Sequence, residues 1–159
     1  MRAGRPPARI GRRHRRIVHG VGLGLWLSGV LWLLSHHVFV PEGEFGPTHR
    51  SADAWLLAAH GAFGFAALWV FGLLWGVHIP AGWAQGRRRG SGMTLFAGIG
   101  LLAGTGWALY YCGDEALRPA VSSVHWVLGL AAPVALILHR RRRKSGFSRE
   151  LRPWTRPKG

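Results

Sequence analysis

Two histidines, His125 and His139, lie 14 residues apart in an apolar segment, S-V-H-W-V-L-G-L-A-A-P-V-A-L-I-L-H, that is followed by four arginines and a lysine. In an α-helix, 14 residues rise about 21 Å and bring the two side chains back to within roughly 40° of each other. Both imidazoles therefore share one helix face, one toward the basic end of the segment and one toward the opposite end. Imidazole nitrogens are axial ligands of haem iron, so this spacing suits one haem in each half of a membrane.

Partner ligands at matching depths are present in two other apolar segments. His60 lies about two turns inside its segment from the end opposite the basic residues, as His125 does. His19 lies within about one turn of a basic end, as His139 does. The sequence therefore predicts two haem b groups, one held by His60 with His125 and one by His19 with His139. An iron with two imidazole ligands has no open position and transfers electrons rather than activating oxygen.

His78 is an alternative ligand, because it lies 18 residues after His60 and so on the same helix face. Eighteen residues rise about 27 Å, however, roughly one turn more than the spacing of His125 and His139. Matching depth therefore favours His19 over His78 as the partner of His139.

Four stretches without Asp, Glu, Lys or Arg provide the helices that would position these histidines. Each exceeds the roughly 20 residues needed to cross a bilayer, and they span Ile17–Pro41, Ala54–Gly86, Gly90–Gly113 and Pro119–His139. We therefore expect an all-α fold, an integral membrane four-helix bundle with helices at about 17–40, 54–84, 92–112 and 120–140. This haem-binding domain, residues 17–139, would lie between a disordered basic tail at 1–16 and a second basic tail at 141–159.

The formal net charge of +15 is segregated along the chain. Of the 21 Lys and Arg residues, only Arg50 and Arg118 lie outside the N-terminal tail, the loop at Arg87–Arg89 and the segment after His139. Five of the 6 acidic residues fall in the other two loops. The positive-inside rule then predicts that both termini are cytoplasmic, in a bacterial inner membrane. Topology and attraction to anionic membrane lipid account for the charge, without nucleic acid as a partner.

Two arginines accompany the histidines at the basic end. Arg16 lies three residues before His19, and Arg140 directly follows His139. Guanidinium groups form strong charge-assisted hydrogen bonds with carboxylates, so we expect both arginines to pair with haem propionates.

Three short motifs contain the predicted ligands: R-x-x-H at Arg16–His19, A-H-G-A-F-G around His60, and H-W-V-L-G from His125 with a second histidine at His139. They resemble motifs of the bacterial four-helix di-haem membrane cytochromes b, of the cytochrome b-561 and the hydrogenase and formate-dehydrogenase cytochrome type. The resemblance covers most of residues 15–140. It implies the same two haem pairs and, given the short loops and a third helix without histidine, a short branch of that family.

The resemblance implies transmembrane electron transfer in a respiratory chain, between a quinone pool or redox subunit and a redox protein at the outer face. The sequence shows no nucleophile–base set and no metalloprotease motif, which favours an electron carrier or a membrane subunit of an oxidoreductase over a stand-alone enzyme. Such a chain would act as a homodimer or as a subunit of a larger complex.

A haem-free membrane scaffold or anchor subunit is the alternative. Histidines near a membrane boundary are commonly only interfacial polar residues, and glycines at four-residue spacing allow helices to approach closely. The chain has three such G-x-x-x-G pairs, Gly20/Gly24, Gly72/Gly76 and Gly100/Gly104. An absorption spectrum of the purified protein separates the two interpretations.

Overall fold

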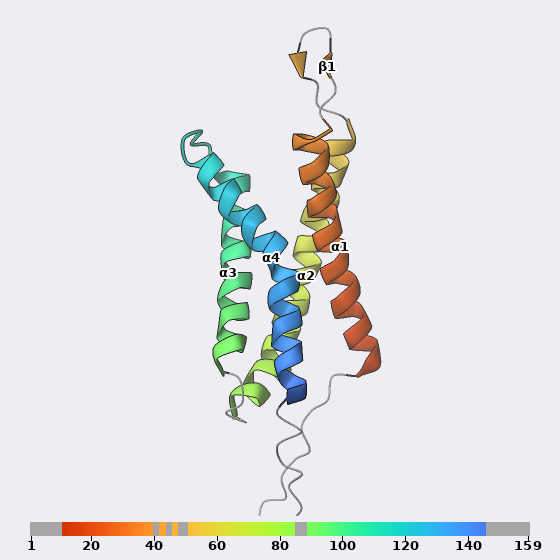
Figure 1. Ribbon diagram of the computed structural model, residues 1–159, viewed down its shortest axis with the longest axis vertical. Helices are drawn as coiled ribbons and strands as arrows, with labels where there is room; N and C mark the ends of the chain where they lie inside the picture. Colours follow the sequence, from red (N-terminus) through yellow and green to blue (C-terminus); the bar gives the residue numbers. More distant parts are fainter. Residues whose placement is uncertain (1–10, 40–41, 44–45, 48–50, 85–88, 146–159) are drawn as a thin grey trace, which may run out of the picture.

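The computed structural model describes residues 11–39, 42–43, 46–47, 51–84 and 89–145, and this part of the chain contains four helices. They are α1 (Arg12–His37), α2 (Ser51–Ala84), α3 (Arg89–Tyr111) and α4 (Arg118–Ser145), shown in Figure 1. Between α1 and α2, the two-residue strands β1 (Glu42–Gly43) and β2 (Gly46–Pro47) pair as an antiparallel ribbon. The predicted all-α, four-helix fold is confirmed.

Each of the four helices is long and apolar enough to cross a membrane. Large apolar side chains lie on the outside of the bundle: Trp55 is 77% exposed and Tyr110 84%. Within the described residues, the buried ones are Val70, Ser28 and Asp53. An apolar exterior of this extent is a liability in water but matches the hydrocarbon of a bilayer. The structure is therefore compatible with a multi-pass membrane protein.

The ends of α1 and α4 differ from the predicted boundaries. Residues 12–16, which we expected in a disordered tail, form the start of α1, and residues 141–145 extend α4. Arginine is among the better helix formers, and basic residues at a helix C-terminus interact favourably with the helix dipole. Both helices therefore continue beyond their apolar stretches. The remaining parts of the two predicted tails, 1–10 and 146–159, lie outside the described residues.

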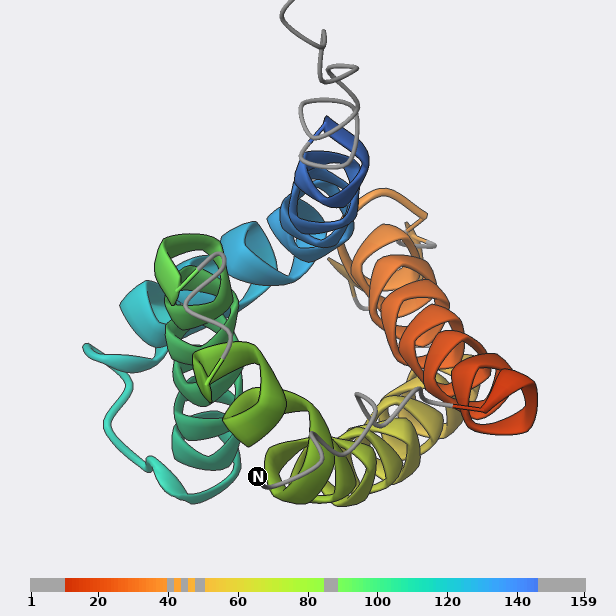
Figure 2. The ribbon, with the colours of Figure 1, turned by 90° about the horizontal axis from the view of Figure 1, so that it is seen from below.

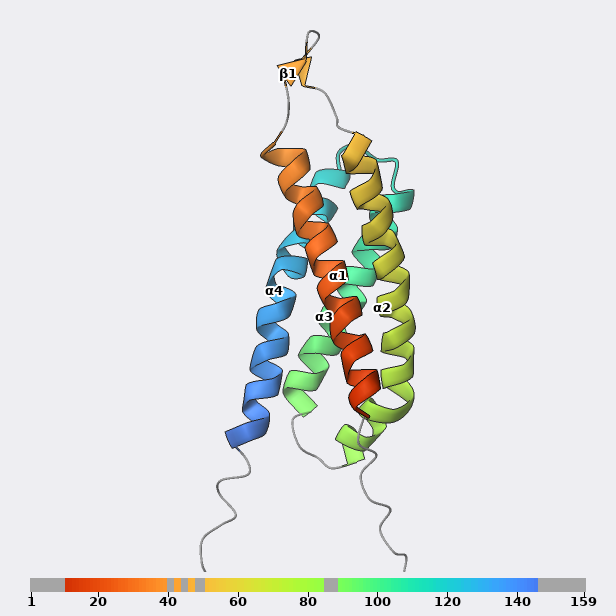
Figure 3. The ribbon, with the colours of Figure 1, turned by 90° about the vertical axis from the view of Figure 1, so that its right-hand side faces the viewer.

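The helices run alternately up and down and pack as two pairs (Figure 3). α1 packs on α2 and α3 packs on α4, whereas contacts of α1 with α4 and of α2 with α3 are sparse. Seen along the bundle, the four helices form a ring (Figure 2). The first residues of α1 and α3 and the last residues of α2 and α4 therefore lie at the same end of the bundle (Figure 1).

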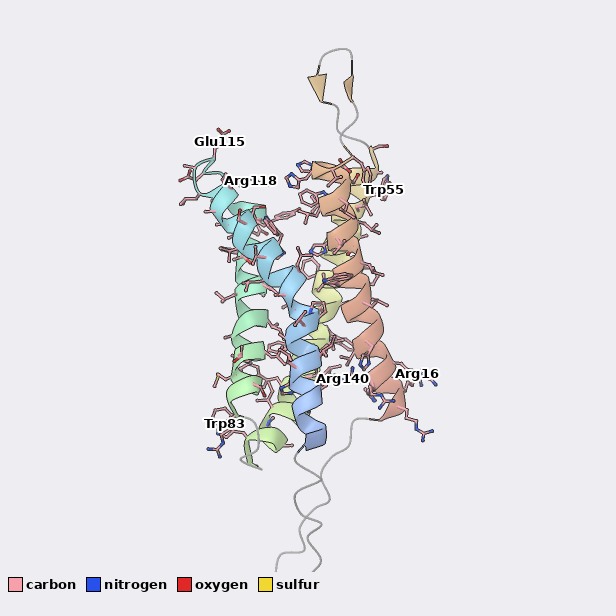
Figure 4. The ribbon with its side chains drawn as sticks, in the orientation of Figure 1. Arg16, Trp55, Trp83, Glu115, Arg118 and Arg140 are labelled. Atoms are coloured by element: carbon pink, nitrogen blue, oxygen red, sulfur yellow. The ribbon has the colours of Figure 1, made fainter. Side chains whose placement is uncertain are left out.

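The two ends of the bundle differ in charge (Figure 4). Arg16 and Arg140 lie at one end, which we term the basic end, and Glu115 lies at the other, the acidic end. α2 carries Trp55 near the acidic end and Trp83 near the basic end. Tryptophans at both ends of an apolar helix are typical of the two interfaces of a membrane.

α4 bends along its length (Figure 1). Pro133 lies inside this helix and lacks the N–H group that would bond the carbonyl of Gly129. A proline is the usual cause of such a bend. Beyond the bend, the last part of α4 approaches α1, where Arg140 contacts His19.

Candidate functional site

His60 of α2 and His125 of α4 lie next to each other, in the half of the bundle nearer the acidic end. Their ring centroids are 6.2 Å apart and their ring planes are nearly perpendicular, at 86°. Both side chains are half-buried. The structure thus brings together, from different helix pairs, the two histidines of the first predicted haem site, which we term the acidic-end pair.

The separation of these rings fits a single metal ion between them. With about 2.0–2.1 Å for each metal–nitrogen bond, as for zinc, and about 1.1 Å from nitrogen to ring centroid, two opposed imidazoles have centroids roughly 6.3 Å apart. The observed 6.2 Å matches that distance. The acidic-end pair therefore has the ring separation that two imidazole ligands of one iron require.

The orientation of the His60 ring is determined by α1. Its Nδ1 lies 3.0 Å from the carbonyl oxygen of Leu25 and 3.2 Å from Oγ of Ser28. A carbonyl can only accept a hydrogen bond, so Nδ1 carries the proton and donates it. The Ser28 hydroxyl itself donates to the Leu25 carbonyl at 3.0 Å, which leaves its oxygen as a second acceptor. Nε2 is then the nitrogen whose lone pair is available to a metal.

The His125 ring is held in the same way by α3. Its Nδ1 lies 2.9 Å from Oγ1 of Thr105. The Thr105 hydroxyl donates to the carbonyls of Leu101, at 2.7 Å, and Leu102, at 3.2 Å. His125 therefore also carries its proton on Nδ1 and has Nε2 available for a metal.

Glycines on α1 and α3 make room for the two rings. A Cβ on Gly29 would lie 2.8 Å from Cε1 of His60, and one on Gly106 would lie 3.3 Å from Cε1 of His125. Glycine is therefore required at position 29 if the His60 ring is to keep its place, and at position 106 a Cβ would be tight.

The second predicted pair, His19 and His139, is the basic-end pair. Nδ1 of His19 hydrogen-bonds the carbonyl of Arg15, and Nε2 of His19 lies 2.7 Å from Nη1 of Arg140. His19 is therefore also protonated on Nδ1, and Arg140 donates to the nitrogen that a metal would take. Nδ1 of His139 lies 3.1 Å from Oγ of Ser91 on α3. The structure places the two histidines on neighbouring helices at the same end of the bundle.

The other predicted site residues lie around the basic-end pair. Arg16 is exposed at the basic end of α1 (Figure 4), and Arg140 contacts His19. His78 is exposed on α2 and forms no hydrogen bond with the described residues. The guanidinium of Arg140 contacts the imidazole of His19, and its expected pairing with a haem propionate stays a prediction.

Within the part of the chain that the structure describes, no group of three or more His, Cys, Asp or Glu side chains is placed to hold a metal ion. A pair of imidazoles fits a prosthetic group that brings its own equatorial ligands. Porphyrin supplies four nitrogens and leaves two axial positions for the protein.

Sequence patterns did not predict the roles of Ser28, Ser91 and Thr105, which contact His60, His139 and His125 respectively. A signal was present, since each hydroxyl residue is directly followed by glycine. That signal is weak without the structure, because small residues at helix contacts are common in membrane proteins.

No family model, curated protein or solved structure matches the chain.

Proposed function

We propose that this protein is a b-type membrane cytochrome that transfers electrons across a membrane between two bis-histidine haems. The observation that carries the proposal is the acidic-end pair, whose centroid separation of 6.2 Å suits a six-coordinate haem iron. Polar groups within membrane helices are costly and are usually retained for function. Two opposed, hydrogen-bonded imidazoles on different helices are more than helix packing requires.

In this proposal, the haem iron supplies one-electron chemistry, and the chain supplies position. His60 and His125 would hold the haem nearer the acidic end. Their Nδ1–H groups are bound by α1 and α3, so neither ring is free to rotate. With both axial positions filled by the protein, oxygen has no coordination site, which favours electron transfer over oxygen chemistry.

The second haem would be held by His19 and His139. Arg140 donates to Nε2 of His19, so haem binding at this end would require the guanidinium to move. A propionate would be a stronger acceptor for it than a neutral imidazole, because hydrogen bonds between two charged groups are about twice as strong as neutral ones. Arg16 would be the second propionate partner.

The charge difference between the two ends supports the proposed orientation. The positive-inside rule would place the basic end, with both termini, in the cytoplasm of a bacterium and the acidic end outside its inner membrane. Electrons would then pass between a quinone or redox subunit and an outer redox protein, with anionic lipid around the basic end.

A haem-free scaffold is the second candidate, and one observation favours it. A Cβ at Gly72 or Gly76 on α2, or at Gly100 or Gly104 on α3, would have nothing within 4 Å. These G-x-x-x-G pairs do not pack against helices of the described chain, so they are available to helices of another subunit. One chain could serve both functions, and an assay for bound haem distinguishes a cytochrome from a haem-free scaffold.

The test is a reduced-minus-oxidised absorption spectrum of the purified protein, with haem quantitation. We expect two haem b per chain and the low-spin spectrum of two imidazole ligands. His125→Ala should lose about half of the haem, because one of the two sites loses an axial ligand. His37→Ala is the matched control, since His37 is an exposed histidine near the acidic end outside both pairs. If the protein purified from haem-supplied cells contains no haem, the proposal is wrong and the haem-free scaffold remains as the candidate function.

A further inference from the structure

α3 contains no histidine, but it carries two hydroxyl residues at the spacing of the histidines on α4. Ser91 and Thr105 are 14 residues apart, as are His125 and His139. Because α3 and α4 are antiparallel neighbours, equal spacing places both pairs in contact at once. Thr105 lies 2.9 Å from Nδ1 of His125, and Ser91 lies 3.1 Å from Nδ1 of His139.

α1 provides the same contact for α2. Ser28, which is buried, lies 3.2 Å from Nδ1 of His60. In both helix pairs, therefore, the earlier helix offers a hydroxyl to a histidine of the later one. Ser28 and Thr105 are each followed by the glycine against which the imidazole packs, Gly29 and Gly106.

We propose that Ser28, Ser91 and Thr105 are positioning residues that set the ring orientation and the redox potential of the haems, an inference that rests on the proposed function. α3, which carries no ligand, would then be the helix that holds both ligands of α4.

The hydroxyls at positions 28 and 105 are held as acceptors by their own helices. Thr105 donates its proton to backbone carbonyls one turn earlier, at 2.7 and 3.2 Å, and Ser28 does so at 3.0 Å. Each oxygen can therefore only accept from an imidazole N–H. Within hydrocarbon there is no water to replace a lost acceptor, so removing the hydroxyl weakens the hold on the ring.

The hydrogen bond at Nδ1 also acts on the iron. An Nδ1–H group that donates strongly makes the imidazole a better electron donor through Nε2. A better donor stabilises ferric relative to ferrous haem and lowers the midpoint potential. Loss of the hydroxyl should therefore raise the potential of the haem it serves, and at His60 the Leu25 carbonyl that remains should prevent complete loss of ligation.

The experiment compares Thr105→Val with Thr105→Ser by redox titration and by electron paramagnetic resonance of the ferric haems. Valine keeps the shape and removes the hydroxyl, while serine keeps the hydroxyl. We expect Thr105→Val to raise the potential of the acidic-end haem, change its low-spin signal and weaken haem retention about 10–100-fold. Thr105→Ser should behave as the parent protein. Ser91→Ala should affect only the other haem.

Thr94→Val is the matched control, because the Thr94 hydroxyl is on the same helix and donates to the carbonyl of Gly90. It should change neither haem. If Thr105→Val leaves potential and signal unchanged, or if Thr94→Val shifts them equally, the hydroxyls do not position the ligands.

A second readout does not depend on haem. In the haem-free protein, ¹⁵N resonances of the histidine side chains should show His125 protonated on Nδ1, with Thr105→Val increasing the Nε2-protonated form. If the protein binds no haem but shows this change, the proposed function is wrong, while the role of Thr105 in orienting the His125 ring stands. A His125 protonated on Nε2 in the parent protein would overturn the positioning itself.

Discussion

At the scale of single residues, the proposed function depends on four imidazoles and on the small groups that orient them. Two of them, His19 and His60, donate from Nδ1 to a backbone carbonyl, and His125 donates from Nδ1 to the Thr105 hydroxyl. That bond selects the tautomer with a lone pair on Nε2. A hydrogen bond to the non-coordinating nitrogen is what metal-binding histidines generally have. The ring orientation suited to ligation is thus already present without a ligand.

A substitution at Gly29 tests this packing. Gly29→Ala would place a Cβ 2.8 Å from Cε1 and 3.0 Å from Nδ1 of His60, so the ring must leave the Leu25 carbonyl. We expect the acidic-end haem to be lost, which is about half of the haem per chain when two are bound. Alanine is a better helix former than glycine, so α1 itself should remain folded.

The control for Gly29→Ala is Gly22→Ala on the same helix, where an added Cβ has nothing within 4 Å. It should retain both haems in the same quantitation. Full haem content in Gly29→Ala would mean that His60 does not bind from the position seen here.

At the scale of elements, each helix pair contributes one histidine to the acidic-end pair. The histidine comes from the second helix of each pair, α2 or α4, and its hydrogen-bond acceptors come from the first, α1 or α3. Close packing within the pairs orients the rings, and the two rings meet edge to face between the pairs. At the basic end, the long side chain of Arg140 on α4 reaches His19 on α1.

The choice between His19 and His78 as the partner of His139 belongs to this scale. Both side chains are exposed, but His19 contacts Arg140 of α4. We therefore expect His19→Ala to lose the basic-end haem and His78→Ala to retain both, as measured by haem content and by the two steps of a redox titration. The opposite result would assign that haem to α2.

At the scale of the whole molecule, the bundle has one strongly basic end and one acidic end. For the described residues, this follows from an even number of alternating helices, which brings the first residues of α1 and the last residues of α4 to the same end (Figure 1). Lipid at the cytoplasmic face attracts such a basic end. The two haem sites would lie one above the other along the electron path.

Reporter fusions test the orientation. A fluorescent protein fused after Gly159 should fluoresce, and alkaline phosphatase fused there should be inactive, because the positive-inside rule places this end in the cytoplasm. A phosphatase fusion within the acidic turn, at Asp114, should be active. Phosphatase activity at Gly159 would reverse the proposed orientation of the bundle in the membrane.

Much of the architecture could be predicted from the sequence, because it depends on local composition. Stretches of more than 20 uncharged residues identify membrane-crossing helices without any knowledge of their neighbours, and charge identifies the ends. The helix boundaries were less accurate, as residues 12–16 show, because basic residues extend a helix beyond its apolar part. Depth along a helix follows from its constant rise per residue. The pairs of histidines that lie at the same depth could therefore also be proposed from the sequence.

The sequence by itself thus determined the number of helices, their approximate spans and the depth of each histidine. Only the tertiary structure decided which side chains meet, because that depends on how each helix is rotated and with which helix it packs. Ser28 contacts His60, and Thr105 contacts His125, only because α1 packs on α2 and α3 packs on α4. The contact of Arg140 with His19 likewise depends on the approach of α4 to α1, since the two residues are far apart in the chain.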